Sequence, residues 1–114
     1  MPSAIYERWS VVVVPFPFTD IELSKRRPAL VLSPASFQER HGHLICGMIT
    51  SAAHSEWPTD VRLTAYQEAG LRKPCTFRLK LFTVQAGLVL YRLGDIAEAD
   101  RKAIANVTRD LLPT

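Results

Sequence analysis

The sequence lacks several features that would assign it to a specialised class of protein. No apolar run approaches the roughly 20 residues that a membrane-spanning helix needs, and the longest, VVVV at 11–14, has the length of a strand. The first residues, MPSAIYERW, do not have the basic-then-apolar layout of a secretory signal, so we expect a cytoplasmic protein. The sequence also has no internal repeat, low-complexity tract or linker, and we expect residues 1–114 to form a single domain.

Cysteine is scarce as well. Cys46 and Cys75 form neither a CxxC unit nor a metal-ligand spacing. Cys46 lies in an apolar run and is expected in the core, and a disulfide is the less favoured alternative in a chain without a secretion signal. His41 and His43 could chelate a metal if they lay on a strand, but no third ligand stands at a suitable spacing. We therefore expect a surface loop here, and no metal or other cofactor.

The composition is that of a compact globular protein. Hydrophobic residues make up 47% of the 114 residues, which excludes disorder and suffices for a real core. The formal net charge of +3 is only weak support for nucleic-acid binding. The distribution of charge says more, because the cations gather in or beside loops between apolar runs, at Lys25–Arg27, Arg72–Lys73, Arg78 and Lys80.

Short apolar stretches at close spacing predict a mainly β fold. They are either rich in β-branched residues or alternate apolar with polar side chains, the patterns of buried and half-buried strands. We expect strands at 10–17, 29–33, 44–51, 60–63 and 76–84, with a loop at 19–27. The strand at 76–84 should bury the face of Phe77 and expose the face of Arg78 to water. Residues 34–40 could form a loop or one helical turn, and residues 87–93 a strand or a short helix.

The last element is the clearest helix. Between residues 98 and 112, Ile104, Val107 and Leu111 repeat at helical spacing with charges on the opposite side. Asp95, or a residue just after it, could cap the helix. Short strands followed by one terminal helix predict a small β-barrel or curled sheet with a packed helix.

The segment 11–34, VVVVPFPFTDIELSKRRPALVLSP, reads as strand, loop and strand, and the loop ends in three cations. Its words PFPFTD and KRRPALVLSP resemble the N-terminal signature of the PemK/MazF-like toxins, the mRNA interferases of type II toxin–antitoxin pairs. The resemblance continues in order through ICGMITS, WPTDVRL, AGLRKPC, KLFTV and RLGDI, and so covers nearly the whole chain. It implies an SH3-like β-barrel with a C-terminal α-helix, usually assembled as a symmetric homodimer.

The resemblance also implies a function. A family member would cleave single-stranded RNA without a metal, by attack of a ribose 2′-hydroxyl that leaves a cyclic phosphate and a 5′-hydroxyl. Its partners would be single-stranded RNA and a cognate antitoxin with an acidic tail, with no membrane and with DNA only indirectly through the antitoxin complex. Two alternatives stay open, a non-catalytic toxin that binds a protein target such as gyrase, and a degenerate relative that only binds.

Three residues are candidates for catalysis. Arg27 matches the family arginine that directly precedes a proline, and Pro28 restricts Arg27 to extended backbone angles. A guanidinium fixed in this way is a good phosphate ligand, because its planar fork matches two phosphate oxygens. Thr50 ends the run ICGMI, where the family carries threonine or serine, and its hydroxyl could donate to a phosphoryl oxygen. Glu22 lies five residues before Arg27, the spacing of a catalytic glutamate in one branch, and is a provisional base.

Each of these residues also has an ordinary structural interpretation. Arg27 could be a solvated arginine that closes a turn, and Thr50 a threonine that bonds its neighbouring backbone. Glu22 could be a solvated loop acid, and nearby arginines would lower its pKa and weaken it as a base. We expect RNA contacts from a further set, Lys25, Arg26, Ser51, Arg78 and Lys80.

The chain departs from the family pattern in two places. Another branch uses a histidine in the first loop and an arginine–x–aspartate pair on a later strand, but this chain has no histidine before residue 41, and Lys80 stands where the aspartate would follow Arg78. The general acid and base therefore stay open, with His54 as an alternative. At the start of the first strand, Trp9 and Ser10 stand where many relatives have Gly-Asp.

Two aromatic residues flank the expected site. Phe18 precedes the basic loop, and Trp57 follows the strand that ends at Thr50. Either could stack on an unpaired base, as aromatic side chains do in single-strand recognition. The alternative is that both belong to the core or to an interface.

Overall fold

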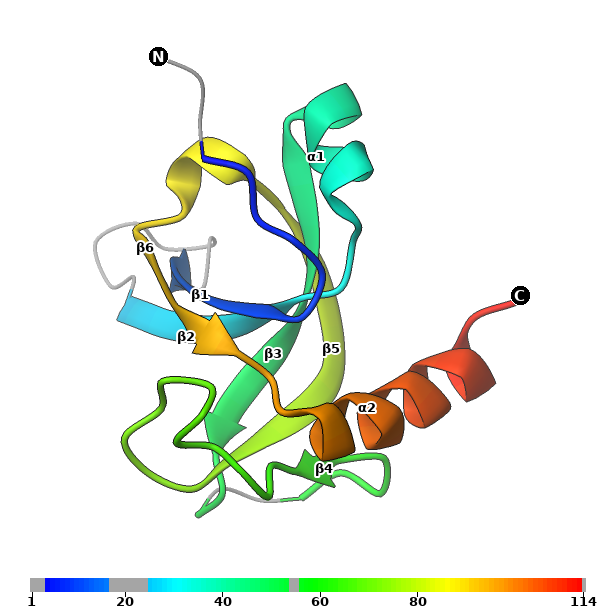
Figure 1. The fold of residues 1–114 in the computed structure, drawn as a ribbon. Coiled ribbons are helices and arrows are strands. Elements are labelled where there is room, and N and C mark those ends of the chain that lie inside the picture. The colour runs from blue at the N-terminus through cyan, green and yellow to red at the C-terminus, as the bar shows by residue number, and fades with distance from the viewer. Residues whose placement is uncertain (1–3, 17–24, 54–55, 114) are drawn as a thin grey trace.

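A computed structural model describes residues 4–16, 25–53 and 56–113 and shows a curled antiparallel sheet with two helices (Figure 1). The strands are β1 (Ser10–Phe16), β2 (Lys25–Val31), β3 (His43–Ser51), β4 (Val61–Arg62), β5 (Cys75–Gln85) and β6 (Tyr91–Asp95). The helical elements are α1 (Ala35–His41), the short 3-10 helix η2 (Ala86–Leu88) and α2 (Glu98–Leu111). The mainly β fold with a C-terminal helix is confirmed.

The strands form one sheet in the order β4-β5-β3-β2-β1-β6. The pairing of β3 with β5 is the longest, and its register shifts between Gly47 and Met48. Gly47 is required at this point, because a side chain there would collide with the ring of the fully buried Phe77. The shift and the missing side chain allow the two long strands to bend together, which Figure 1 shows as the curl of the sheet.

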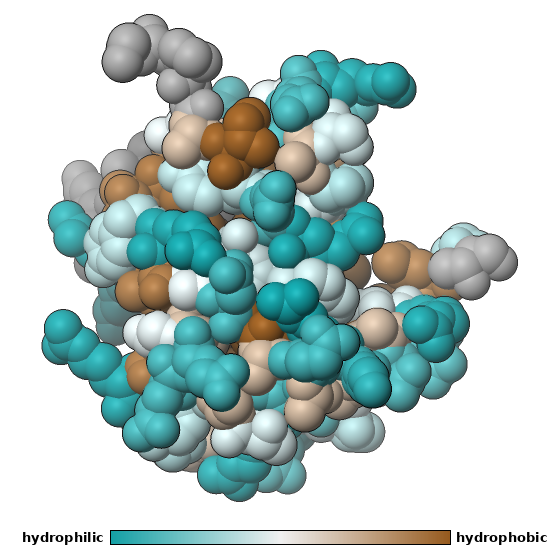
Figure 2. All heavy atoms as spheres, viewed as in Figure 1, coloured by the Kyte–Doolittle hydropathy of each residue, from teal (hydrophilic) through white to brown (hydrophobic). Residues whose placement is uncertain are grey.

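The sheet has a hydrophobic cluster on each face. Because successive residues of a strand point to opposite faces, β1 supplies Val11 to one cluster and Val12 and Val14 to the other. This double burial explains why β1 reads as an unbroken apolar run. On the face in view in Figure 2, hydrophilic side chains predominate and the hydrophobic ones appear as small separate groups, as expected for a protein whose apolar residues are mostly inside.

Helix α2 closes the cluster that contains Val11. Ile104 on its inner side is fully buried, and Val107 packs against the same cluster. The expected cap at Asp95 is wrong, because the helix starts after Ala97 without a side-chain cap, and Asp95 instead pairs with Arg92 at 2.6 Å. None of the described helices is long and apolar enough to cross a membrane.

The first turn of α2 is tied to the chain before β5 by a buried carboxylate. Asp100 is 2% exposed and accepts hydrogen bonds from the N–H groups of Thr64 and Ala65 and from the Thr64 hydroxyl. The buried carboxyl group therefore has hydrogen-bond partners inside the protein. The contact holds the connection between β4 and β5 against the helix.

Several segments differ from their sequence-based predictions. Lys25–Arg27 are not the end of a loop but the first residues of β2, since the paired strand begins earlier than expected. Residues 35–41 form helix α1, whose buried Gln38 accepts a hydrogen bond from the N–H of Tyr6 and donates one to the carbonyl of Ala4. The ambiguous segment 87–93 divides between η2 and β6.

The face of β5 that was predicted to be wet is exposed at Lys80 but covered at Thr76 and Arg78. Thr76 is 8% exposed, and the side chain of Arg78 is 11% exposed. The alternation along this strand was read correctly, since Phe77 lies in the core. At Arg78 the prediction is wrong because Asp60 and Trp57, in the segment that leads into β4, contact this side chain.

Trp9 has an unusual backbone. Its φ is 79°, and it is the only non-glycine residue in the described part of the chain with a positive φ. This conformation favours glycine, which explains why the resembled family often has glycine here. The backbone is held by hydrogen bonds from Trp9 N to Val31 O at 2.8 Å and from Ile96 N to Trp9 O at 3.0 Å. The indole packs against the cluster that contains Val11, which offsets the strain.

Candidate active site

Arg27 and Thr50 lie on the same face of the sheet. Arg27 is opposite Val14 in the β1–β2 pairing, and residues directly opposite in an antiparallel pair share a face. The β2–β3 pairing aligns Ala29 with Met48, and the same register carried two residues further aligns Arg27 with Thr50. The hydrogen-bonded ladder ends before this level. The two residues are therefore brought to one end of one face, although 22 residues separate them in sequence.

Strand β5 adds two polar residues to this face. Thr76 is opposite Thr50, and Arg78 is opposite Met48. Thr50 and Thr76 are both buried, at 6% and 8% exposure. The face thus carries two arginines and two hydroxyl groups at one end, contributed by β2, β3 and β5.

Arg78 forms a two-pronged ion pair with Asp60. Its Nε donates to Asp60 Oδ1 at 3.1 Å, and one terminal nitrogen donates to Oδ2 at 3.0 Å. The guanidinium also lies over the indole of Trp57, 5.1 Å from the ring centroid, within the range of a cation–π contact. Asp60 accepts a further hydrogen bond from the backbone N–H of Trp57 at 3.0 Å. Trp57, which is 41% exposed, is thereby fixed beside the candidate site.

The ion pair sets the charge state of both partners. Burial raises the pKa of Asp60, but hydrogen bonds from Arg78 and the Trp57 N–H, together with the charge of Arg78, outweigh it and hold that pKa below its ordinary value. The hydrogen bond to Asp60 raises the pKa of Arg78. Both side chains are therefore ionised at neutral pH.

Arg27 differs from Arg78 in one respect. The side chain is partly buried, and its Nε is inaccessible to solvent and has no hydrogen-bond partner among the described residues. A buried donor without a partner is costly, and more so when the group is charged. An anion that accepted a hydrogen bond from this nitrogen would remove the cost.

The other residues expected to contact RNA have different surroundings. Lys25 and Arg26 are exposed at the start of β2. The hydroxyl of Ser51 accepts a hydrogen bond from the N–H of Ala53 at 3.3 Å, a local turn contact. Lys80 is exposed in the stretch of β5 where the register with β3 shifts. Only Arg78 of this set is held in the ion pair with Asp60.

Three candidate residues lie outside the described part of the chain: Phe18, Glu22 and His54. Asp60, by contrast, is a polar residue of the site that the sequence reasoning did not single out. Asp60 could have been found from its position in WPTDVRL, directly before β4. Continuing the β4–β5 register by one residue places it opposite Arg78. The carboxylate that pairs with Arg78 thus comes from the segment before β4 and not from β5 itself. Among the residues that the structure describes, no group of three or more His, Cys, Asp or Glu side chains is arranged to hold a metal ion.

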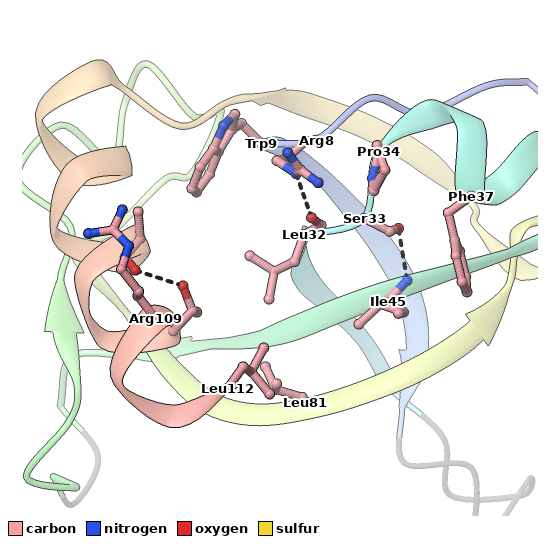
Figure 3. A pocket seen from close by; sticks show the side chains of 12 residues that line it. Arg8, Trp9, Leu32, Ser33, Pro34, Phe37, Ile45, Leu81, Arg109 and Leu112 are labelled. Carbon is pink, nitrogen blue, oxygen red and sulfur yellow. Dashed lines mark hydrogen bonds between the residues drawn. The ribbon is translucent and has the colours of Figure 1, made fainter. Parts of the chain in front are cut away.

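An apolar groove lies apart from these residues (Figure 3). It has a volume of about 440 Å³ and lies between the end of α2, the start of α1 and the β3–β5 pair. Trp9, Leu32 and Leu112 line it, and Arg8 and Arg109 belong to its wall. The candidate catalytic residues Arg27 and Thr50 do not line this groove.

Comparison with known proteins gives a family match over most of the chain. Residues 7–112 match the family described as PemK-like, MazF-like toxin of type II toxin–antitoxin system. No curated protein matches the sequence.

Solved structures are similar in fold. A MazE–MazF complex from Deinococcus radiodurans aligns with a TM-score of 0.75 at 20% identity, covering 95% of this chain and 96% of the other. MazF from the same organism aligns with a TM-score of 0.74 at 22% identity, covering 95% and 96%. An endoribonuclease in complex with its cognate antitoxin, from a mycobacterial species, gives 0.70 at 15% identity, covering 96% and 97%. At these identities the likeness establishes the fold.

Proposed function

The chain belongs to the family of PemK-like, MazF-like toxins of type II toxin–antitoxin systems, and from this premise we propose that it is a metal-independent endoribonuclease that cleaves single-stranded mRNA. A similar solved protein is named an endoribonuclease, which agrees with this activity. Cleavage without a metal needs a base for the ribose 2′-hydroxyl, donors for the charged phosphorane and an acid for the leaving 5′-oxygen.

The observation that carries the proposal is the buried Nε of Arg27, which has no hydrogen-bond partner among the residues that the structure describes. A phosphate is a fitting partner for it, because the planar guanidinium can donate two parallel hydrogen bonds to two phosphate oxygens. The position is also preorganised, since Arg27 sits on a paired strand and Pro28 restricts its backbone. Donors that are already in place stabilise developing charge without reorganisation during the reaction.

Thr50 and Arg78 complete the proposed site in different ways. The Thr50 hydroxyl donates a second hydrogen bond to the phosphoryl group from the same face as Arg27. Arg78 is held by Asp60 and fixes the orientation of Trp57, whose exposed ring offers a surface on which an unpaired base can stack. Lys25, Arg26, Ser51 and Lys80 are proposed to contact the RNA chain.

The proposed general base is Glu22. Asp60 is unsuited to this role, because both of its oxygens accept hydrogen bonds and its pKa is lowered. In the proposed step the base takes the 2′-hydroxyl proton as the 2′-oxygen attacks phosphorus, and an acid protonates the departing 5′-oxygen. The products are a 2′,3′-cyclic phosphate and a 5′-hydroxyl.

The proposed partners follow from the family. The protein is expected to act as a homodimer, to be neutralised by a cognate antitoxin and to meet DNA only through the antitoxin complex. Similar solved structures include a MazE–MazF complex and an endoribonuclease with its antitoxin. The alternatives, a gyrase-binding toxin or a binding-only relative, give no function to the buried Nε of Arg27, which lacks a partner within the described ranges.

Product analysis tests the proposal. The purified protein is incubated in EDTA with a long single-stranded RNA and, separately, with single-stranded DNA of the same sequence. We expect RNA fragments with 2′,3′-cyclic phosphate and 5′-hydroxyl ends by mass spectrometry, and intact DNA, which lacks the attacking hydroxyl. Intact RNA across several sequences, at protein concentrations that bind it, would refute the proposal.

A further inference from the structure

A basic cavity lies on the face of the sheet opposite to Arg27. Arg26 and Arg27 are consecutive on this strand, so their side chains point to opposite faces of the sheet. On the face of Arg26 the structure has a cavity of about 410 Å³. Its lining includes apolar residues together with two arginines and a tyrosine, among them Val13, Pro28, Leu93, Arg26, Arg72 and Tyr91.

The strand register brings most of these residues together. Val13 is opposite Pro28 on β2 and opposite Tyr91 on β6, so the three form a row across one face. Arg26 lies two residues from Pro28 along β2 and therefore points to the same face. The row gives the cavity a rigid apolar floor, with Arg26 on one side and Tyr91 on the other.

Arg72 reaches the cavity through close backbone packing. Gly70 has a φ of 83°, and a side chain on it would run into the backbone carbonyl of Leu93. A side chain on Gly94 would lie only 2.9 Å from the backbone of Ala69. These two glycines allow the connection between β4 and β5 to lie directly on β6, which places Arg72 at the cavity that Arg26 also lines.

The cavity has the chemistry of a nucleotide site. Among the residues that the structure describes, no acidic side chain lines it, and neither Arg26 nor Arg72 forms a salt bridge with another of them. Two arginines at one cavity repel each other unless an anion lies between them. Tyr91 is 48% exposed although it is a large ring on a strand, so a face of the ring is accessible for stacking. Stacking of bases on aromatic rings beside arginines is the usual arrangement in single-strand binding.

We propose that this cavity is a nucleotide subsite distinct from the Arg27 face, in which Arg26 and Arg72 hold a phosphate and Tyr91 stacks on a base of the RNA chain. The proposal rests on the proposed ribonuclease function, since RNA is the ligand. Because β2 begins at Lys25, an RNA strand that passes around this end of β2 reaches Arg27 on one face and Arg26 on the other. The subsite therefore lets the protein bind RNA nucleotides beyond those next to the bond that is cut.

Binding of a non-cleavable RNA tests the subsite. The probe is a fluorescent 12-nucleotide RNA with 2′-O-methyl riboses, which cannot attack the phosphate. Tyr91→Leu is expected to weaken binding about 5-fold or more, the loss of one stacked base. Arg72→Ala is expected to weaken binding and to reduce the salt slope of the affinity by about 1. Tyr91→Phe keeps the ring and should bind like the wild type, and Arg40→Ala, an exposed arginine on α1, is the matched control.

A second measurement separates this proposal from the proposed function. Adenosine monophosphate is titrated into the protein and the ring resonances of Tyr91 are followed by NMR. Shifts in the wild type that are lost in Arg72→Ala support the subsite, even if the protein fails to cleave RNA. Cleavage by the wild type together with unchanged RNA affinity in Arg72→Ala and Tyr91→Leu overturns the subsite alone. Weaker RNA binding by Arg72→Ala with unchanged binding by Tyr91→Leu also overturns the subsite, because a site that contributes only charge does not recognise a nucleotide.

Discussion

Arg78 and Asp60 are joined by two hydrogen bonds of 3.1 and 3.0 Å, with side chains that are only 11% and 9% exposed. The pair connects β5 to the segment before β4 and covers a face of the sheet that carries Thr50 and Thr76. It also holds Trp57 in place through the cation–π contact from Arg78 and the hydrogen bond that the Trp57 backbone N–H donates to Asp60. The surroundings of the candidate site thus depend on one nearly buried ion pair.

Removing the carboxylate charge from this pair is expected to be strongly destabilising. Asp60→Asn leaves the charge of Arg78 largely buried without its counter-ion, at a cost of about 3 kcal/mol in the free energy of unfolding. Urea denaturation monitored by tryptophan fluorescence measures the change. Asp95→Asn is the matched control, because it breaks a pair with Arg92 whose side chains are 50% and 47% exposed and is expected to cost less than about 1 kcal/mol. Equal effects of the two substitutions would contradict this view of the Asp60 pair.

Asp60 also predicts a pH dependence of stability. Its pKa in the folded protein is lowered, so the unfolded chain binds a proton at this site more readily than the folded one does. Its contribution is therefore present above the ordinary aspartate pKa of about 3.9 and is lost as the pH falls through the lower folded value. Unfolding free energies measured between pH 7 and pH 2 should fall less steeply at the acid end in Asp60→Asn than in the wild type. Parallel curves would show that Asp60 is not the group responsible.

The backbone at Trp9 predicts an inverted order of two substitutions. Trp9→Ala and Trp9→Gly both remove the packing of the indole, but only glycine relieves the positive φ of 79°. At an ordinary strand position glycine is the less stable of the two. Here we expect the glycine variant to be more stable than the alanine variant by about 1 kcal/mol, measured by thermal or urea denaturation. A more stable alanine variant would mean that the backbone changes conformation when the indole is removed.

The fold was predictable where the spacing of apolar residues along a segment is typical of one kind of strand or helix. The valine run of β1, the alternation of β5 and the helical spacing of Ile104 were sufficient. The exact bounds of the two-residue strand β4, and the division of 87–93 into η2 and β6, were not predictable. Elements this short have too few residues to show a regular spacing of apolar side chains. The covered face of Arg78 depends on a partner 18 residues away, which no local pattern reports.

The candidate site was predictable in part. Arg27 and Thr50 were chosen through the family resemblance, and the register then places them on one face of the sheet. Asp60 was missed because its partner Arg78 lies 18 residues away in the sequence, and only the pairing of β4 with β5 brings the two together. The positive φ of Trp9 was not predictable from the sequence, because it depends on the tertiary hydrogen bonds at this position.

The decisive measurement is the single-turnover rate of cleavage of a single-stranded RNA in EDTA by the wild type and by Arg27→Ala, with Arg40→Ala as the matched control. If Arg27 stabilises the phosphorane, the rate should fall by about 100-fold or more in Arg27→Ala, as for loss of one preorganised donor, and stay at the wild-type level in the control. Circular dichroism should show that all three proteins are folded. Cleavage by folded Arg27→Ala at the wild-type rate would contradict the assignment of Arg27 to the active site.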